Sequence, residues 1–452
     1  MEIGLSGLKI YFLGGLGKAG SGSCILAVKN GSGVIIDYGL NMDQLGDNNL
    51  EDIKLFEGMG CNNHDNIYPD YQTLEKILDE GVDIKVVLLT HAHFDHIGAI
   101  HQLLRIFKKR NITPKIGGSV FTLAMLENYL DTANYSVFLP WALNNTGHLK
   151  FNDFTIHYYK TFHSIPGSLG FVLEYEKGEG VLFSGDVKSI FEKQNEINIT
   201  KTRLEDVARK VHIKLAVFDT TNASKPNQVA PETEVAENIH SIWQNTKGRV
   251  ITSFFSSNYG RLKMLYNKIN HNGGIVGICG TSLQTSINAA TWLYGKEQMN
   301  LGQPPDVSLL AVAGCQADYN SALYRWSLGE EARNTALYPT DTFVLSSRPI
   351  PNQPLRQARI AEMLERINHT CNGKVFVDQN VPAEFAGRRV ENLHVSGHGY
   401  ADEIALMLET LQPEIVLPFH SDPQAMVAAT PIIESAKAEA IFLSDFSNFF
   451  IL

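Results

Sequence analysis

The first two hundred residues alternate short apolar runs with glycine-rich turns, which is the pattern of a strand-rich domain. Helical periodicity interrupts these runs at residues 71–80, 97–110 and 119–130. From about residue 214 the rhythm changes, because apolar runs that end in small or polar residues now alternate with helical stretches. This alternation predicts a parallel, doubly wound α/β sheet built on the runs KLAVFDT, RVITSFF, GIVGICG, SLLAVAG and TFVLSS. Strand-rich character returns after about residue 390.

The composition is that of a soluble globular protein with more than one domain, since 44% of the 452 residues are hydrophobic and 19% are charged. The five cysteines are scattered and none forms a CxxC pair, which favours free thiols in a reducing compartment. The N-terminal residues read as a strand and a glycine loop, not as a signal peptide, and no segment has the apolar length to cross a membrane. We therefore expect a cytoplasmic protein without membrane contacts.

The formal net charge of −10 argues against a protein that binds nucleic acid through an overall positive charge. A protein of this charge that handles a polyanion needs local positive charge, or metal ions that supply it.

The stretch THAHFDHIG, residues 90–98, follows an apolar run and precedes a helical one. In an extended segment alternate side chains share a face, so His91 and His93 can reach one metal, while Asp95 and His96 can reach a second. The alternative, satisfied core histidines, is the better interpretation of any single histidine. Three histidines and an aspartate within six positions, in a chain with 15 histidines, favour a metal site instead. Nitrogen and oxygen ligands without thiolate favour zinc, with manganese or iron as alternatives.

The pattern HxHxDH at a strand-to-helix junction resembles the signature of the metallo-β-lactamase fold, an αββα sandwich. The resemblance implies further ligands at later strand ends, namely His163 in TFHSIPGSLG and a bridging Asp186 in LFSGDVKS. Asp37 in IIDYG would be a supporting carboxylate near the metals. The last ligand would be His420 in IVLPFHSD, 234 residues after Asp186.

That long gap, filled by the predicted α/β segment, is similar to the layout of the β-CASP nucleases, in which a second domain is inserted. Residues 1–207 and 391–452 would then form the metallo-β-lactamase domain, and residues 208–390 the doubly wound β-CASP domain. Within this group the chain most resembles ribonuclease J, over nearly its whole length. The motifs that carry this resemblance are VFDTTNA, SFFSSNYGR, AGCQADYNSAL, SSRPIPN and LHVSGHG. The short segment after His420 resembles forms without the C-terminal domain of bacterial members.

The resemblance implies a two-metal site. His91, His93 and His163 would hold the first metal; Asp95, His96 and His420 would hold the second; and Asp186 would bridge them. Two divalent cations, with zinc favoured over manganese, would hold a hydroxide that attacks phosphorus. His398 would act as the general acid for the leaving 3′-oxygen, oriented by Asp219. The alternative is that His398 only binds phosphate.

Phosphate contacts are expected at two serine- and glycine-rich loops, since backbone amides at strand ends and helix N-termini bind anions. For Arg261 a guanidinium clamp and a solvated surface position are both open. The residues implied in these contacts are Ser257, Asn258, Arg261, His394, Ser396 and His398.

The expected function is that of a metal-dependent ribonuclease acting on single-stranded RNA as a 5′–3′ exonuclease, an endonuclease or both. One alternative is a hydrolase of single-stranded DNA or of a small phosphodiester, and another is a non-catalytic RNA-binding scaffold. Ala92, Phe94, Ser421 and Asp422 depart from the residues usual in the family, so the shape of the cleft is open. A homodimer is one expected assembly.

Overall fold

The computed structural model describes residues 7–17, 20–45, 67–130, 138–143, 146–193, 195–295, 299–303, 306–331, 335–350, 353–442 and 449–451. The chain forms two compact units. The first, which we call the sandwich unit, comprises Met1–Val229 and Gly397–Leu452, and the second, the insertion unit, comprises Ala230–Ser396.

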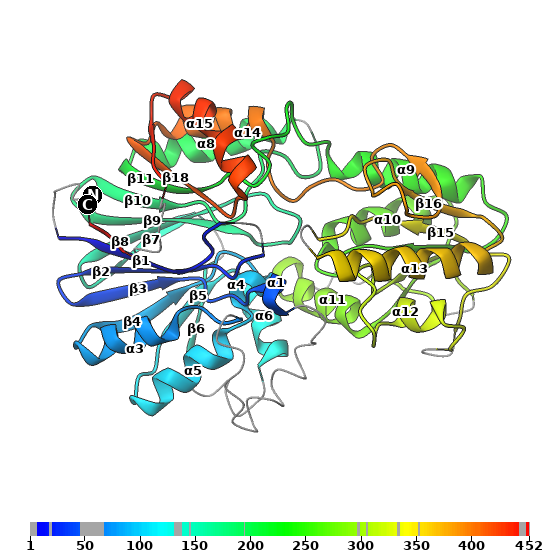
Figure 1. Cartoon of the computed structure of the whole chain (residues 1–452), viewed down its shortest axis with the longest axis horizontal. Coiled ribbons are helices and arrows are strands. Elements are labelled where there is room, and N and C mark those ends of the chain that lie inside the picture. Colours follow the sequence, from blue (N-terminus) through cyan, green and yellow to red (C-terminus); the bar gives the residue numbers. More distant parts are fainter. Residues whose placement is uncertain are drawn as a thin grey trace. The chain divides into compact units, whose positions relative to one another are not determined.

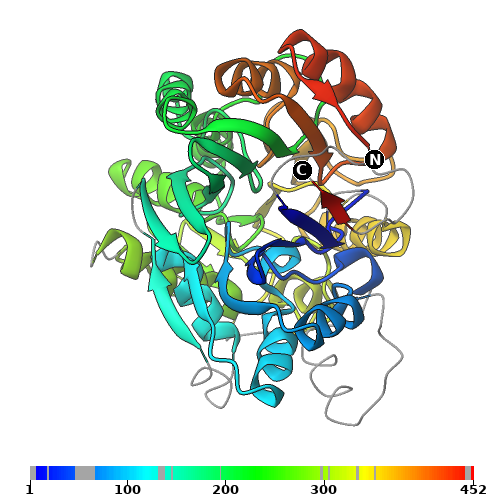
Figure 2. The ribbon, with the colours of Figure 1, turned by 90° about the vertical axis from the view of Figure 1, so that its left-hand side faces the viewer.

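The sandwich unit contains two sheets of seven strands (Figures 1 and 2). The first has the order β20-β1-β2-β3-β4-β5-β6 and the second the order β19-β18-β11-β10-β9-β8-β7. The strands of the first sheet are β1 Lys9–Gly14, β2 Cys24–Lys29, β3 Ser32–Ile36, β4 Asp83–Leu88, β5 Lys115–Gly118, β6 Leu139–Ala142 and β20 Phe449–Ile451. Those of the second are β7 Gly147–Phe151, β8 Phe154–Lys160, β9 Leu169–Glu176, β10 Glu179–Phe183, β11 His212–Asp219, β18 Ile415–Phe419 and β19 Glu439–Ala440.

The core of this unit lies between the two sheets. Ile10, Val34 and Leu88 of the first sheet belong to the same buried cluster as Phe171 and Phe183 of the second. Alternate residues of each strand point to this shared core because successive side chains of a strand face opposite ways.

Helices cover the outer faces of both sheets (Figure 1). On the second sheet, Leu204, Met407 and Ile433 of three helices pack on Val172 and Leu182, which forms a further buried cluster. This arrangement is the expected αββα sandwich. The helices of the unit are α1 Met42–Leu45, α3 Tyr71–Asp79, α4 Phe94–Ile97, α5 Ile100–Lys109, α6 Val120–Tyr129, α8 Glu196–Ala208, α14 Ala401–Leu411 and α15 Pro423–Ser435.

The helices expected at 71–80, 97–110 and 119–130 are confirmed as α3, α5 and α6. Their ends follow from local chemistry: Asp70 accepts a hydrogen bond from the Thr73 amide at the start of α3, and Ser119 accepts one from Thr122 at the start of α6. Within the described residues, no helix combines the length and the apolar character that crossing a membrane requires.

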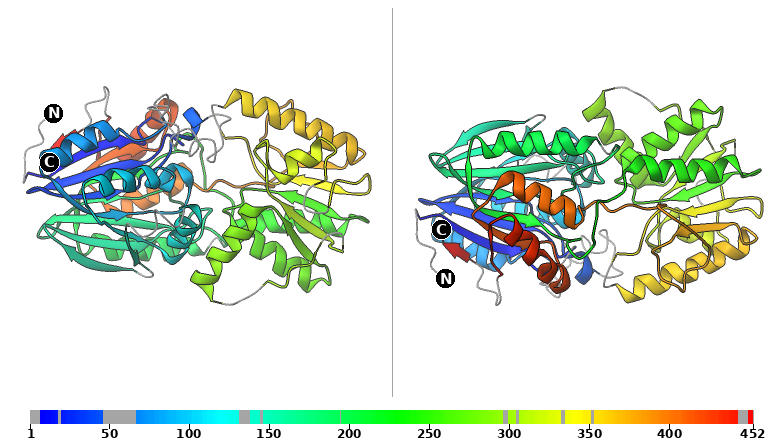
Figure 3. Two further views of the ribbon diagram at one scale, coloured as in Figure 1. Left: turned by 90° about the horizontal axis from the view of Figure 1, so that it is seen from below. Right: turned by 90° about the horizontal axis from the view of Figure 1, so that it is seen from above.

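The insertion unit has one six-stranded sheet in the order β13-β14-β12-β15-β16-β17, and all of its pairings are parallel. Helices lie on both faces of this sheet (Figure 3), so the doubly wound arrangement is confirmed. The strands are β12 Val250–Ser253, β13 Val276–Cys279, β14 Leu309–Val312, β15 Thr342–Leu345, β16 Val375–Asp378 and β17 Arg388–Val390. The helices are α9 Glu232–Gln244, α10 Tyr259–His271, α11 Thr281–Tyr294, α12 Ala322–Ser327 and α13 Pro354–Thr370.

One of the five runs assigned to this sheet lies elsewhere. The segment KLAVFDT is part of β11, which is parallel to both β10 and β18 in the sandwich unit. The structural units therefore meet at Val229/Ala230 and Ser396/Gly397, whereas the sequence-based boundaries lie at 207/208 and 390/391. A buried parallel strand has the same continuous apolar pattern in either sheet, so the sequence pattern alone could not assign this strand to the sandwich unit.

Four cysteines, Cys24, Cys279, Cys315 and Cys371, are buried free thiols, as expected, and Cys61 lies outside the described residues.

Candidate metal centre

The THAHFDHIG motif spans the turn after β4 and the whole of helix α4. His93 has extended backbone dihedrals and stands directly before α4, while His91 is fully buried. The extended backbone lets both rings face the same point, and Nε2 of His91 lies 3.1 Å from Nδ1 of His93. Asp95 and His96 follow on the short helix.

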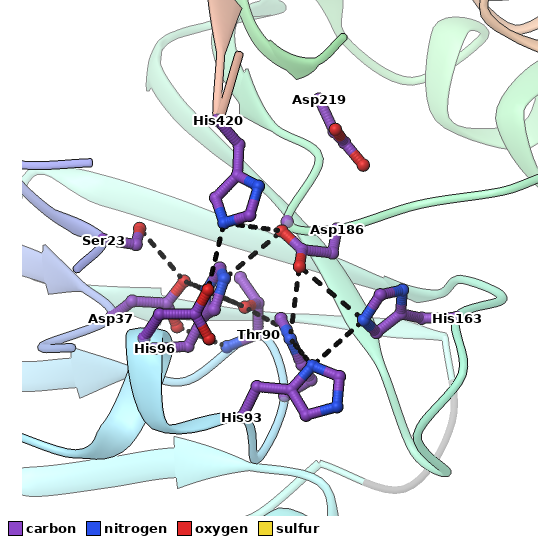
Figure 4. Close-up of polar contacts among 12 residues, drawn as sticks. Ser23, Asp37, Thr90, His93, His96, His163, Asp186, Asp219 and His420 are labelled. Atoms are coloured by element: carbon purple, nitrogen blue, oxygen red, sulfur yellow. Dashed lines mark hydrogen bonds and ion pairs between the residues drawn. The ribbon is translucent and has the colours of Figure 1, made fainter. Parts of the chain in front are cut away.

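The first group of side chains comprises His91, His93, His163 and Asp186, whose candidate ligand atoms all lie within 4.8 Å of one another. Nε2 of His163 is 3.1 Å from Nδ1 of His93. Oδ2 of Asp186 lies 3.5 Å from Nε2 of His91 and 3.6 Å from Nε2 of His163. Imidazole nitrogens that converge in this way on a buried carboxylate are arranged as a ligand set (Figure 4).

The second group comprises Asp95, His96 and His420. Nε2 of His420 is 3.2 Å from Oδ2 of Asp95, and Nε2 of His96 is 3.2 Å from Oδ1 of Asp186. Asp186 thus turns one oxygen to each group, as a bridging carboxylate would (Figure 4). Nε2 of His96 is buried, and although it lies 3.2 Å from Asp186, that contact lacks the geometry of a hydrogen bond and no other described residue provides one. A divalent cation would satisfy that nitrogen, so the residues present fit two metal ions.

The electrostatics suit ligands of a cation. Burial and the neighbouring histidines lower the pKa values of His91 and His163, and they lower that of His93 to about 4. These imidazoles are therefore neutral, which is the form that binds metals. Burial raises the pKa of Asp186, but the charges of His420 and His96 outweigh it and hold that pKa well below its usual range.

Asp37 supports this site from behind, as expected. Its Oδ2 lies 2.7 Å from Nδ1 of His96 and accepts a hydrogen bond from the Thr90 hydroxyl, while its Oδ1 accepts one from the Thr90 amide. In the same way, Nδ1 of His163 lies 2.7 Å from the carbonyl oxygen of Gly397. Hydrogen bonds at Nδ1 fix the ring orientation and leave Nε2 directed at the candidate metals.

Sequence reasoning missed three supporting groups. Thr90 lies inside the motif and could have been noticed there; Gly397 and Ser23, whose hydroxyl is 3.5 Å from Asp37, carry no local signal. A fourth constraint is Gly39, where an added Cβ would lie only 1.7 Å from the carbonyl oxygen of Asp95. Only glycine allows that loop to pair so closely with the ligand turn.

His398 and Asp219 form the expected pair. Nδ1 of His398 is 2.7 Å from Oδ2 of Asp219, and its Nε2 is 3.8 Å from Oδ2 of Asp186, at the side of the site (Figure 4 shows Asp219). Asp219 is itself held by the amides of Val187 and Thr221. Burial lowers the pKa of His398, but the charges of Asp219 and Asp186 raise it to about 9.

The remaining predicted residues, Ser257, Asn258, Arg261, His394 and Ser396, belong to the insertion unit. For Arg261 the structure gives a different role from the phosphate clamp. Its guanidinium is 1% exposed and donates to both oxygens of the fully buried Glu232 and to the Ser346 carbonyl. Asn258 likewise accepts from the Arg261 amide as the cap of α10 and donates to Glu232. Both side chains are thus engaged in joining α9 to α10.

Three family models match the chain. The metallo-β-lactamase superfamily model matches residues 17–198, the ribonuclease J β-CASP domain matches 247–366, and the Zn-dependent metallo-hydrolase RNA specificity domain matches 384–441.

Curated relatives and solved structures show similarity over most of the length. Ribonuclease J of Mycolicibacterium smegmatis is 29% identical over 92% of this chain and 69% of its own length. Ribonuclease J2 of Bacillus subtilis is 24% identical over 96% of this chain and 73% of its own. A crystal structure of a protein of unknown function from Enterococcus faecalis V583 matches with a TM-score of 0.63 and 13% identity, covering 98% of this chain and all of that one, which shows a shared fold.

Proposed function

We propose that this chain, which matches the metallo-β-lactamase superfamily model over residues 17–198 and the ribonuclease J β-CASP model over 247–366, is a metal-dependent ribonuclease hydrolysing phosphodiester bonds of single-stranded RNA. The observation that carries the proposal is Asp186, whose two oxygens face two groups of candidate metal ligands. The RNA specificity model, which spans His394, Ser396, His398 and His420, supports RNA as the polymer.

Zinc is the metal that we propose. The donor set is imidazole and carboxylate without thiolate, and the histidine-rich first group favours zinc over magnesium or calcium. Two such cations would supply a water of lowered pKa and would offset the charge that develops on the phosphoryl group.

The chain's own residues then have distinct roles. The neutral imidazoles of His91, His93 and His163 would hold one cation, and Asp95, His96 and His420 the other, with the Asp186 carboxylate between them. Burial lowers the pKa of His96, but the Asp186 and Asp37 carboxylates raise it against that effect, so a cation that binds there would displace a proton. His398 carries the proton for the leaving 3′-oxygen. Asp219 binds Nδ1 of that ring, which keeps Nε2–H directed at the site. Trimming from a 5′ end, internal cleavage, cytoplasmic action and a homodimer complete the proposal.

The test compares single-stranded RNA labelled at its 3′ end with the same strand bearing a 5′-monophosphate or a 5′-hydroxyl, and with DNA. Protein of measured metal content should cleave RNA, and Asp95→Ala should abolish cleavage together with bound metal. Asp79→Ala is the matched control, because Asp79 is a highly exposed aspartate paired with Arg110 on the surface. Cleavage of DNA alone would instead support the hydrolase of single-stranded DNA. Absence of cleavage with two metals bound would contradict the ribonuclease.

A further inference from the structure

The 59 residues from 238 to 296 contain no aspartate or glutamate, in a chain that has 48 acidic residues and a net charge of −10. They contain six basic residues, three of which pair with carboxylates outside the segment: Arg249 with Asp341, Arg261 with Glu232 and Lys268 with Glu237. Two helices of the insertion unit, α10 and α11, lie in this segment and contact each other. These two helices therefore contribute no carboxylate that would repel an approaching polyanion.

The outer face of α11 is polar, uncharged and ends in an exposed tryptophan. Thr281, Gln284, Asn288 and Trp292 recur at helical spacing and are exposed, whereas Leu283, Ser286, Ala289 and Ala290 face the core. Trp292 is 69% exposed. Burying such a side chain on folding would have been favourable, so its exposure beside hydrogen-bonding amides points to a ligand that can stack on it.

A second aromatic group stands at the same end of α11. Tyr294 is 48% exposed and stacks on Tyr259 of α10, with ring centroids 5.9 Å apart and planes at 17°. Nζ of Lys263 lies 5.2 Å from the Tyr294 ring centroid. The stacked pair holds the Tyr294 ring in place, and Lys263 adds a cation beside it.

The opposite end of α11 opens on a cavity of about 350 Å³. Ser256, Ser282 and Gln316 contribute to its lining, and the Ser282 hydroxyl donates to that of Ser256. Two charged residues, Asp318 and Arg325, also line it, and Asp318 is paired with Arg356 at 2.9 Å. The cavity lies at the carboxyl ends of β12, β13 and β14, where the connections after the neighbouring strands β12 and β14 leave in opposite directions along the sheet. Open parallel sheets bind ligands at such points.

We propose that the outer face of α11 is a docking surface for single-stranded RNA. Trp292 stacks on one base, Tyr294 with Lys263 contacts the strand beside it, and the cavity at Ser282 accepts a nucleotide. Aromatic rings among uncharged donors, on helices that carry no carboxylate, are features that bind single strands without regard to sequence. The inference rests on the proposed ribonuclease function, because it names where that enzyme holds its substrate away from the bond that is cut.

The experiment measures binding of a 20-nucleotide oligoadenylate to the full-length protein in the Asp95→Ala background, where the strand is not cut. Tryptophan fluorescence and a direct binding isotherm are recorded together. Trp292→Ala should remove the RNA-induced quenching and weaken binding by about 5- to 100-fold, and Trp292→Phe should restore most of the affinity. Leu355→Ala, which truncates a 75%-exposed apolar residue of α13 in the same unit, is the matched control and should leave binding unchanged.

Cleavage assays with Asp95 intact separate the two hypotheses. Trp292→Ala should cut a 5′-phosphorylated dinucleotide at the parent rate and lose efficiency only on long strands. If the parent cleaves RNA while Trp292→Ala binds and quenches as the parent does, the docking surface is wrong and the ribonuclease stands. If the parent neither binds nor cleaves RNA, the proposed function fails and the docking surface with it.

Discussion

The Asp219 carboxylate is the charged group nearest to His398, and this contact decides when that imidazole carries a proton. Oδ2 of Asp219 lies 2.7 Å from Nδ1 of His398, whose pKa is raised to about 9 although burial opposes the shift. An imidazole with its ordinary pKa of about 6.5 would be mostly neutral at neutral pH, and it could not then act as the acid that transfers a proton to the leaving oxygen.

Asp219→Asn should therefore move the alkaline limb of the pH–rate profile to lower pH. The substitution removes the negative charge that favours the imidazolium, so the pKa of His398 falls, and the acid form is lost at a lower pH. Bound cations lower the pKa of His398 in the parent and in the variant alike. The shift of the alkaline limb between the two proteins therefore reports the effect of Asp219. The measurement is kcat against pH at saturating RNA. Metal content should be unchanged, since Asp219 belongs to neither ligand group, and an unshifted limb with lower kcat would contradict a general acid at His398.

The clustering of the candidate ligands could be predicted because their chemistry is concentrated in a short motif, and because the family resemblance pointed to His163, Asp186 and His420. The groups that hold the candidate ligands and Asp37 in place could not be predicted. Ser23 and Gly397 act through a hydroxyl and a backbone carbonyl, groups that every sequence offers in abundance. Their roles arise only when distant strand ends meet.

Strand ends are the elements that build the site. His91 follows β4, His163 follows β8, Asp186 follows β10, and His420 follows β18. His420 has a positive φ of 61°, a backbone conformation that side chains rarely adopt and that turns the ring back toward the site. The sequence pattern located these strands well, but it could not state which sheet β11 would join.

The α9–α10 pair shows a second limit of reading motifs. Arg261 lies in a segment that resembles a phosphate loop, yet it is buried against Glu232, so we expect it to stabilise the insertion unit. Arg261→Met should destabilise that unit by about 3–5 kcal/mol, because the Glu232 carboxylate is left buried without its partner. Arg261→Met combined with Glu232→Leu should recover much of the loss.

Chemical unfolding of these variants measures the effect. Lys268→Ala is the control, since it breaks a more exposed ion pair with Glu237 on the same helices and should cost at most about 1 kcal/mol. If the Arg261→Met protein were as stable as the parent but bound 5′-phosphorylated RNA more weakly, the result would support a phosphate clamp at Arg261 instead.

At the scale of the whole molecule, the candidate metal ligands come from both sequence segments of the sandwich unit, with His91 in the first and His420 in the second, so bound cations would join residues far apart in the sequence. An ion that binds only the folded state adds stability, about 2.7 kcal/mol when its concentration is a hundredfold above Kd. Without it, the nitrogens and oxygens turned toward the candidate metals lie against one another, as Oδ2 of Asp186 does against His91 and Oδ2 of Asp95 against His420. The insertion unit shares none of these ligands.

Chelation should therefore lower the melting temperature of the sandwich unit by several degrees and leave the transition of the insertion unit in place. Differential scanning calorimetry before chelation, after it, and after zinc or manganese is restored separates the two transitions and ranks the two metals. Asp95→Ala should already melt at the lower temperature and respond less to the chelator, because one ligand group is incomplete. If both transitions fell together, the metals would stabilise the chain as one cooperative body; if neither moved, the ligand groups would not hold a metal that matters for folding.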